Sequence, residues 1–282
     1  MNVWYAGVPW AEAALLLAAA ILLPLAWPLV ERRDDDARAA PLLRLAGRVR
    51  WPAALCLIAA FFLPQGAAAA ALSMPWAVFA ALCGTAGLLR LRRDARSSAA
   101  ESALDLGLVF LAGGAAWAVI SRYGLRPMRF EPIIVLLTAV HFHYAGFLLP
   151  LMSAAACRAA PGALARFAAL GSVAGVPLLA VGFAFLPPLE LAAAALITAA
   201  SIALAAVQFR LALRCRSPAA MWLLALSSVS LLTGMALAAG YAWGEYTGRP
   251  FLDIPTMLPL HGALNGIGFA FCGLLGWRHN RS

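Results

Sequence analysis

The sequence predicts an all-α bundle of about nine transmembrane helices, and three observations support that fold class. Hydrophobic residues make up 64% of the 282-residue chain, charged residues only 12%, and the mean hydropathy is +0.86. Such a composition cannot supply the polar shell of a water-soluble domain. The apolar residues form long blocks between short Arg-bearing connections, and a helix satisfies its own backbone inside lipid. We therefore expect a single transmembrane domain over residues 1–282, in the cell inner membrane.

Nine windows are apolar over the roughly 20 residues that a spanning helix needs. Pro64, Gly66 and Pro75 interrupt the second and third of them. All nine are longer and more uniformly apolar than the alternating strands of a membrane barrel. In chain order the windows are 10–30, 51–71, 74–90, 101–120, 132–152, 166–186, 189–209, 219–241 and 259–277.

The distribution of arginine predicts an N-terminus outside and a C-terminus in the cytoplasm, because cytoplasmic connections carry the excess of basic residues. The first span has no basic residue before it, which predicts an uncleaved anchor. The side expected to be cytoplasmic carries Arg32, Arg33, Arg38, Arg44, Arg48, Arg50, Arg90, Arg92, Arg93, Arg96, Arg158, Arg166, Arg210, Arg214, Arg216, Arg278 and Arg281. The opposite side carries Arg122, Arg126, Arg129 and Arg249.

The net charge of +9 follows from these arginines. Arginines between apolar blocks set orientation and meet anionic headgroups, so membrane lipids are expected partners and nucleic acid is not. Four tryptophans near predicted span ends are interpreted as interfacial aromatics, namely Trp4, Trp10, Trp76 and Trp243.

Two histidines in the fifth window are the first candidates for chemistry. His141 and His143 lie in an otherwise apolar stretch, where an ionisable group is costly unless function or a partner retains it. At about 100° per residue, Thr138, His141 and Tyr144 share one face while His143 points nearly opposite. Both histidines can serve one site only if the helix is distorted, and Pro150 offers a cause.

Two other windows carry polar residues on one face. His261 and Asn265 lie one turn apart on the last span, and Glu101 and Asp105 one turn apart on the fourth. Counting about 1.5 Å per residue, His261 lies just inside the outer boundary, His141 about 13 Å below it, and Asp105 about 10 Å above the cytoplasmic edge. These depths predict a polar column from the outer surface to the middle of the membrane.

The run His141-Phe-His-Tyr-Ala-Gly-Phe147 and the later pattern of His261, Asn265, Gly268 and Phe269 resemble the signatures of the YndJ-like family of bacterial multi-pass membrane proteins. The acidic pair on the earlier helix is also similar. The resemblance implies that the histidines, Tyr144 and Asn265 are site positions, and it implies no defined activity.

The first functional reading is an intramembrane enzyme acting on an isoprenoid or other lipid-like substrate by general acid and base catalysis. Isomerisation, epoxide opening or cyclisation would need no nucleotide cofactor. The groups expected to transfer protons are His141, His143, Asp105, Glu101 and His261. Tyr144, Asn265 and Thr138 would orient the substrate, and Trp117, Phe142 and Phe147 would stabilise developing positive charge.

Two alternatives stay open. A proton-coupled transporter would use the same histidines and Asp105 as a relay. An intramembrane hydrolase would hold zinc with His141, His143, His261 and Asp105, but histidines two residues apart on a helix cannot reach one ion without unwinding. We therefore expect no cofactor or metal, with zinc as the less favoured possibility.

Overall fold

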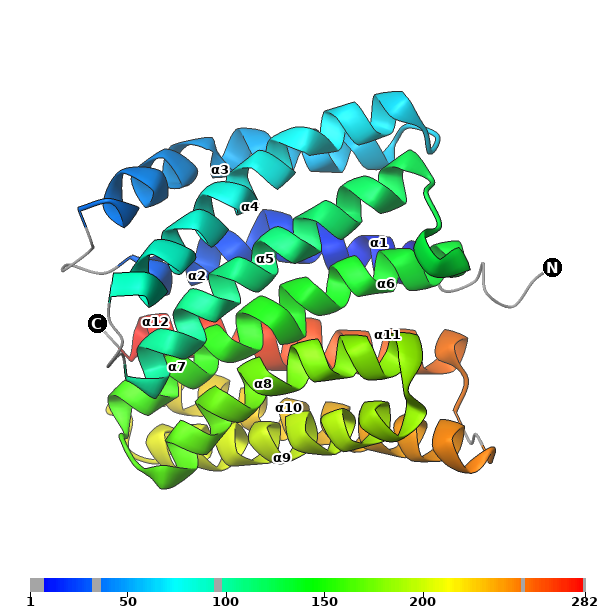
Figure 1. Ribbon diagram of the computed structural model, residues 1–282. Helices are drawn as coiled ribbons and strands as arrows, with labels where there is room; N and C mark the ends of the chain where they lie inside the picture. The colour runs from blue at the N-terminus through cyan, green and yellow to red at the C-terminus, as the bar shows by residue number, and fades with distance from the viewer. Residues whose placement is uncertain (1–7, 32–36, 94–97, 250–251, 281–282) are drawn as a thin grey trace. The chain divides into compact units, whose positions relative to one another are not determined.

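The computed structural model describes residues 8–31, 37–93, 98–249 and 252–280, and every regular element in these ranges is helical (Figure 1). The elements are α1 (Val8–Leu17), η2 (Ala18–Leu22), α2 (Leu23–Val30), α3 (Ala39–Phe61), α4 (Ala67–Arg93), α5 (Ala99–Tyr123), η3 (Pro127–Arg129), α6 (Pro132–His141), η4 (Phe142–Leu148), α7 (Leu149–Ala159), α8 (Ala163–Phe185), α9 (Pro187–Ala212), α10 (Pro218–Thr247), α11 (Ile254–Ala263), η5 (Leu264–Phe271) and α12 (Cys272–His279).

Three of the long helices contain a π-helical segment, in which each turn holds an extra residue. Segment η2 joins α1 to α2, η4 joins α6 to α7, and η5 joins α11 to α12. When consecutive α- and π-helical segments are counted as one helix, the described residues form nine long helices, which confirms the polytopic all-α fold. Eight of them are long and apolar enough to cross a membrane.

Helix α3, the long helix that is not among these eight, differs from its predicted window. The hydropathy of the sequence places a span at 51–71, whereas the helix begins at Ala39 and ends at Phe61. Its first half carries Arg44, Arg48 and Arg50, so α3 is absent from the eight apolar spans. Helix formation therefore starts inside the stretch that hydropathy marks as a polar connection.

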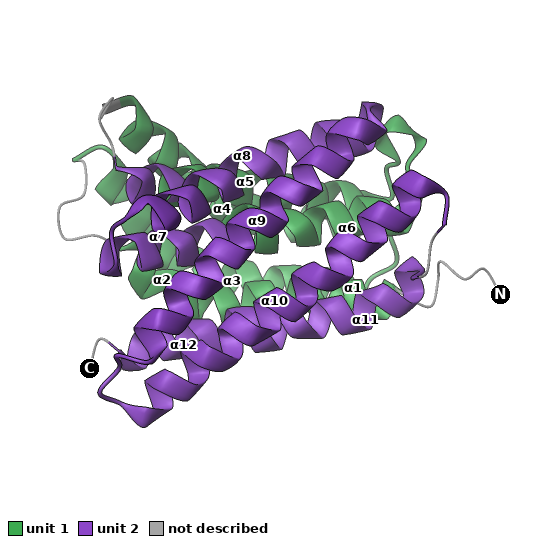
Figure 2. Cartoon of the chain, turned by 90° about the horizontal axis from the view of Figure 1, so that it is seen from below, with its two compact units in different colours: residues 1–97, 104–148 green, residues 98–103, 149–282 purple. Residues whose placement is uncertain are grey.

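The helices pack as two compact units, coloured separately in Figure 2. Unit 1 comprises residues 1–97 and 104–148, and within it α3 packs along α4 and α1 against α6. Unit 2 comprises residues 98–103 and 149–282, and within it α9 packs between α8 and α10, while α10 also contacts η5 and α12. The single transmembrane domain expected from the sequence stays a prediction.

The predicted orientation also stays a prediction, and five of the residues used for it or for the interfacial assignment lie outside the described residues. These are Trp4, Arg32, Arg33, Arg96 and Arg281.

Candidate functional site

His143 is a buried, fully bonded side chain of unit 1. It is 1% exposed, its Nδ1 lies 2.8 Å from the carbonyl oxygen of Ala139, and the Trp76 indole Nε1–H donates to its Nε2 at 3.1 Å. An indole nitrogen can only donate, so Nε2 accepts and carries no proton. Nδ1 then carries the proton and donates it to the carbonyl. The two bonds together fix one neutral tautomer.

Trp76 corrects an expectation from the sequence. It was interpreted as an interfacial aromatic, but its side chain is fully buried, with its ring 5.9 Å from the His143 ring and nearly parallel to it. On its other side it contacts Phe79 at 4.9 Å between ring centroids. Trp10 and Trp243 are exposed, at 55% and 60%. The position of Trp76 near Pro75 at a predicted span end gave no signal of a partner 67 residues away.

Gly114 on α5 leaves the space that His143 occupies. A Cβ atom at position 114 would lie 2.8 Å from His143 Nδ1 and 2.9 Å from the Cβ of Phe142. Both distances are shorter than a van der Waals contact, so only glycine fits without a shift. Gly113 differs, because a Cβ there would meet the Phe142 ring at an ordinary 3.5 Å.

His141 has the opposite environment. Its side chain is exposed, and its Nδ1 lies 2.7 Å from the carbonyl oxygen of Leu137, one turn earlier. Among the described residues its Nε2 has no hydrogen-bond partner. With Nδ1–H donated to a backbone carbonyl, the Nε2 lone pair is presented outward, which is the tautomer that a general base uses. The distortion η4 begins directly after His141, yet it does not turn both histidines to one side.

The other predicted residues near the fifth-span motif have separate local roles. The Tyr144 hydroxyl donates to the carbonyl of Ala14 at 2.9 Å, tying η4 to α1. The Thr138 hydroxyl donates to the carbonyl of Ile134 at 2.8 Å. Phe142 meets Phe110 edge to face at 6.2 Å.

Two further predicted aromatic residues differ in burial. Phe147 is buried in the core of the unit, and Trp117 is half-buried. The expectation that these rings stabilise a cation stays untested.

Asp105 is paired with Arg90, which the sequence marks only as one of the orienting arginines. Arg90 Nη1 on α4 lies 3.7 Å from Asp105 Oδ1 on α5, and the two side chains are 5% and 3% exposed. The two side chains form an ion pair inside the unit. Gly87 permits this approach of the helices, because a Cβ there would collide with the backbone carbonyl of Asp105.

Glu101 is held by a different arginine. Arg158 on α7 donates from Nε to Glu101 Oε1 at 2.9 Å, and both side chains are about one-third exposed at 31% and 28%. The one-turn spacing of Glu101 and Asp105 therefore reflects two separate ion pairs, one in each compact unit.

His261 and Asn265 form a bonded pair in unit 2. His261 Nδ1 lies 2.9 Å from the carbonyl oxygen of Gly234 on α10, and Asn265 Nδ2 donates to the carbonyl of His261 at 2.9 Å. Asn265 Nδ2 also lies 3.2 Å from His261 Nδ1. A Cβ at position 234 would meet the Asn265 amide at 2.6 Å, so the glycine lets the amide reach this position. The predicted pairing of these two residues on one face is correct.

A buried polar cluster in unit 2 was not predicted. Gln208 on α9 is fully buried, and its Nε2 donates to the hydroxyl of Ser227 at 2.8 Å and to that of Ser228 at 3.3 Å. Ser227 in turn donates to the carbonyl of Phe269 at the end of η5. The only sequence signal was one amide inside an apolar span, close to its arginine-bearing end.

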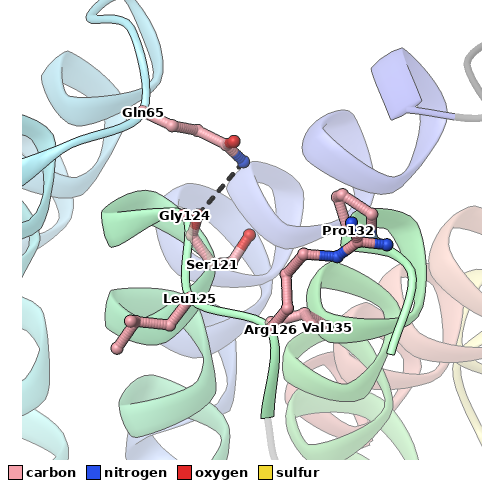
Figure 3. Close-up of a pocket in the computed structure, with 7 residues that line it drawn as sticks. All are labelled: Gln65, Ser121, Gly124, Leu125, Arg126, Pro132 and Val135. Carbon is pink, nitrogen blue, oxygen red and sulfur yellow. Dashed lines mark hydrogen bonds between the residues drawn. The ribbon is translucent and has the colours of Figure 1, made fainter. Parts of the chain in front are cut away.

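Two pockets in the described part of the chain, one at the end of α5 and one beside α9, are lined by no predicted site residue. Figure 3 shows the smaller, a narrow hollow at the end of α5 where the Gln65 amide donates to the carbonyl of Ser121 at 3.1 Å. The larger, about 340 Å³, lies between the start of α8 and the end of α9.

The predicted zinc ligands do not come together. Among the described residues no three His, Cys, Asp or Glu side chains lie close enough to hold one ion. His143 has both ring nitrogens engaged and Asp105 faces Arg90. These residues do not fit the zinc site considered from the sequence.

Comparison with known proteins gives a family and no activity. The model of the YndJ-like protein family matches residues 13–269. The chain is 29% identical over 272 residues to the "Uncharacterized membrane protein YndJ" of Bacillus subtilis (strain 168), covering 95% of this chain and 48% of the relative. It therefore spans about half the length of that relative. No solved structure matches. With the match extending across nearly every helix, this multi-pass membrane protein belongs to the YndJ-like family.

Proposed function

We propose that the protein is an inner-membrane enzyme that transfers a proton to and from a lipophilic, isoprenoid or lipid-like substrate, with His141 as the acid–base group. The observation that carries the proposal is the hydrogen bond from His141 Nδ1 to the Leu137 carbonyl, which leaves Nε2 available on an exposed face. That face belongs to the membrane-spanning helix Pro132–Ala159, so a substrate would reach it laterally from the bilayer.

The arrangement favours isomerisation over the other reactions considered. A single imidazole can remove a proton from one carbon of the substrate and return it to another, so no second acid is needed and atoms balance. His143 has both nitrogens bonded and Asp105 is ion-paired, so neither is assigned proton transfer. Tyr144, whose hydroxyl donates to Ala14, positions the segment that carries His141.

Solvent deuterium tests the proposal without a known substrate. Full-length protein in lipid nanodiscs is incubated in deuterated water with a bacterial lipid extract, and the lipids are analysed by mass spectrometry. We expect deuterium to enter one lipid class with the wild type and His279→Gln, and at least about 100-fold more slowly with His141→Gln. Incorporation by His141→Gln at the rate of the wild type would overturn the assignment. Incorporation by the wild type that does not exceed that of a sample without protein would also overturn it.

A proton-coupled transporter is the second candidate. The buried Arg90–Asp105 pair favours it, because ionisable pairs inside spans mark many proton pathways. Proteoliposomes containing a pH-sensitive dye separate the two candidates. Transport predicts substrate-dependent proton movement that Asp105→Asn abolishes, with no chemical conversion of the substrate.

A further inference from the structure

The pocket between α8 and α9 carries a binding surface that the histidine site does not use. Its volume is about 340 Å³, which is within the range of small-molecule pockets. It is formed by the connection 160–162, by the first residues of α8, by Val207, Arg210 and Leu211 near the end of α9, and by Arg214 just beyond that helix, all in unit 2.

Two arginines one turn apart line this pocket. Arg210 and Arg214 are exposed, and among the described residues neither side chain has an ion-pair or hydrogen-bond partner. Other arginines of the chain are engaged, for example Arg158 by Glu101 and Arg126 by Glu131. Two guanidinium groups at i and i+4 can each offer paired donors to one phosphate.

The opposite wall adds donors and apolar surface. Helix α8 begins after Gly162, which has no side chain to cap it, so the first N–H groups of this 23-residue helix lack a side-chain acceptor. The first residues of this helix, Ala163, Leu164 and Ala165, line the same pocket as the arginines. Leu164, Val207 and Leu211 supply the larger aliphatic side chains of the lining. A pocket with cationic donors and an aliphatic wall at the end of two spans matches a ligand with a charged head and hydrocarbon chains.

We propose that this pocket binds the phosphate of an anionic phospholipid, with Arg210 and Arg214 as its ligands. The phosphate diester lies between the two guanidinium groups and the start of α8, and the acyl chains lie along Leu164, Val207 and Leu211. A soluble phosphate would present the same anionic group to the two arginines. The aliphatic wall of the pocket is the observation that favours a lipid over a soluble phosphate.

Native mass spectrometry of the full chain in detergent tests the proposal with phosphatidylglycerol, phosphatidylcholine and inorganic phosphate as probes. The test variant is Arg210→Gln/Arg214→Gln. The matched control is Arg44→Gln/Arg48→Gln, which removes two exposed arginines at the same spacing on α3, neither of which lines the pocket. Both variants lower the net charge by the same amount.

We expect the wild type to bind phosphatidylglycerol about tenfold more tightly than phosphatidylcholine, the control to keep that preference, and the test variant to lose it. An equal loss in both double variants would overturn the proposal, because general surface charge would then explain the binding. Binding of inorganic phosphate that depends on Arg210 and Arg214, without binding of phosphatidylglycerol, would assign the pocket to a soluble anion and overturn the lipid.

Discussion

His141 and His143 are two residues apart and have contrasting surroundings. His143 exchanges hydrogen bonds with Ala139 and Trp76 inside the unit, whereas His141 bonds only to its own preceding turn and stays exposed. A buried imidazole with both nitrogens hydrogen-bonded stabilises the structure. Protonation of His143 would place a new Nε2–H opposite the Trp76 Nε1–H, so that two donors would face each other. The pair is therefore one structural histidine and one histidine with an available nitrogen.

Trp76→Phe tests the structural role of His143. The substitution keeps an aromatic ring but removes the indole N–H, so His143 Nε2 is left buried without a donor. We expect a loss of about 1–3 kcal/mol in the free energy of unfolding, measured by thermal denaturation in detergent. Trp222→Phe is the control, because Trp222 is 69% exposed. Equal stability of Trp76→Phe and Trp222→Phe would contradict the bond.

At the scale of the element, the two sequence motifs coincide with π-helical segments. The His-Phe-His-Tyr-Ala-Gly-Phe run ends inside η4, and Asn265, Gly268 and Phe269 lie in η5. Such segments recur at functional sites, because the extra residue re-aims side chains. The need for a distortion could be predicted from the spacing of the histidines. Its form could not, because the residues around the histidine motif are almost all apolar and carry no pattern that marks a π-helical turn.

The neighbouring glycines of α5 test the packing of η4. Gly114→Ala places a methyl group 2.8 Å from His143 Nδ1, whereas Gly113→Ala makes an ordinary contact with Phe142. We expect Gly114→Ala to lower the free energy of unfolding by about 1–3 kcal/mol and Gly113→Ala to leave it nearly unchanged. Thermal denaturation of both variants in the same detergent decides the matter, and equal effects would argue against the close approach.

The first turn of α11 has a pH-sensitive cap. Asp253 accepts a hydrogen bond from the backbone N–H of Thr256 at 2.9 Å, and its hydrogen bonds with Thr256, side chain first and then backbone, lower the pKa of its carboxyl below 3.8. A lowered pKa in the folded state means that the stabilisation is present above the unfolded pKa and is lost as the pH falls through the folded one.

Asp253→Asn keeps a good cap without this titration. We expect the melting temperature of the wild type to fall more steeply than that of Asp253→Asn between about pH 5 and pH 3. Parallel pH profiles would show that the carboxylate does not contribute.

At the scale of the whole molecule, the sequence predicts where the chain crosses the membrane better than it predicts what each polar group contacts. Apolar length locates eight helices, although several of them extend further at one end than their predicted windows, since a span is a property of one contiguous segment. The start of α3 is missed because three arginines lower its hydropathy. The Trp76–His143 and Arg90–Asp105 contacts are missed because they join different helices, and one sequence contains no signal of such pairing.

The crossing of α3 decides the topology of the chain. If α3 crosses the membrane with its arginines at the interface, nine crossings place the two ends of the chain on opposite sides. We expect reporter fusions to show the N-terminus outside and the C-terminus in the cytoplasm. Both ends on one side would mean that α3 lies outside the hydrocarbon core.

The central claim, that His141 presents the reactive imidazole and His143 does not, is tested most directly by chemical modification. Diethyl pyrocarbonate acylates accessible neutral imidazole nitrogens, and peptide mass spectrometry locates the adducts in full-length protein treated within its membrane. The account predicts rapid labelling of His141 and protection of His143, with both labelled after denaturation in detergent. Labelling of His143 as fast as His141 in the folded protein would contradict it.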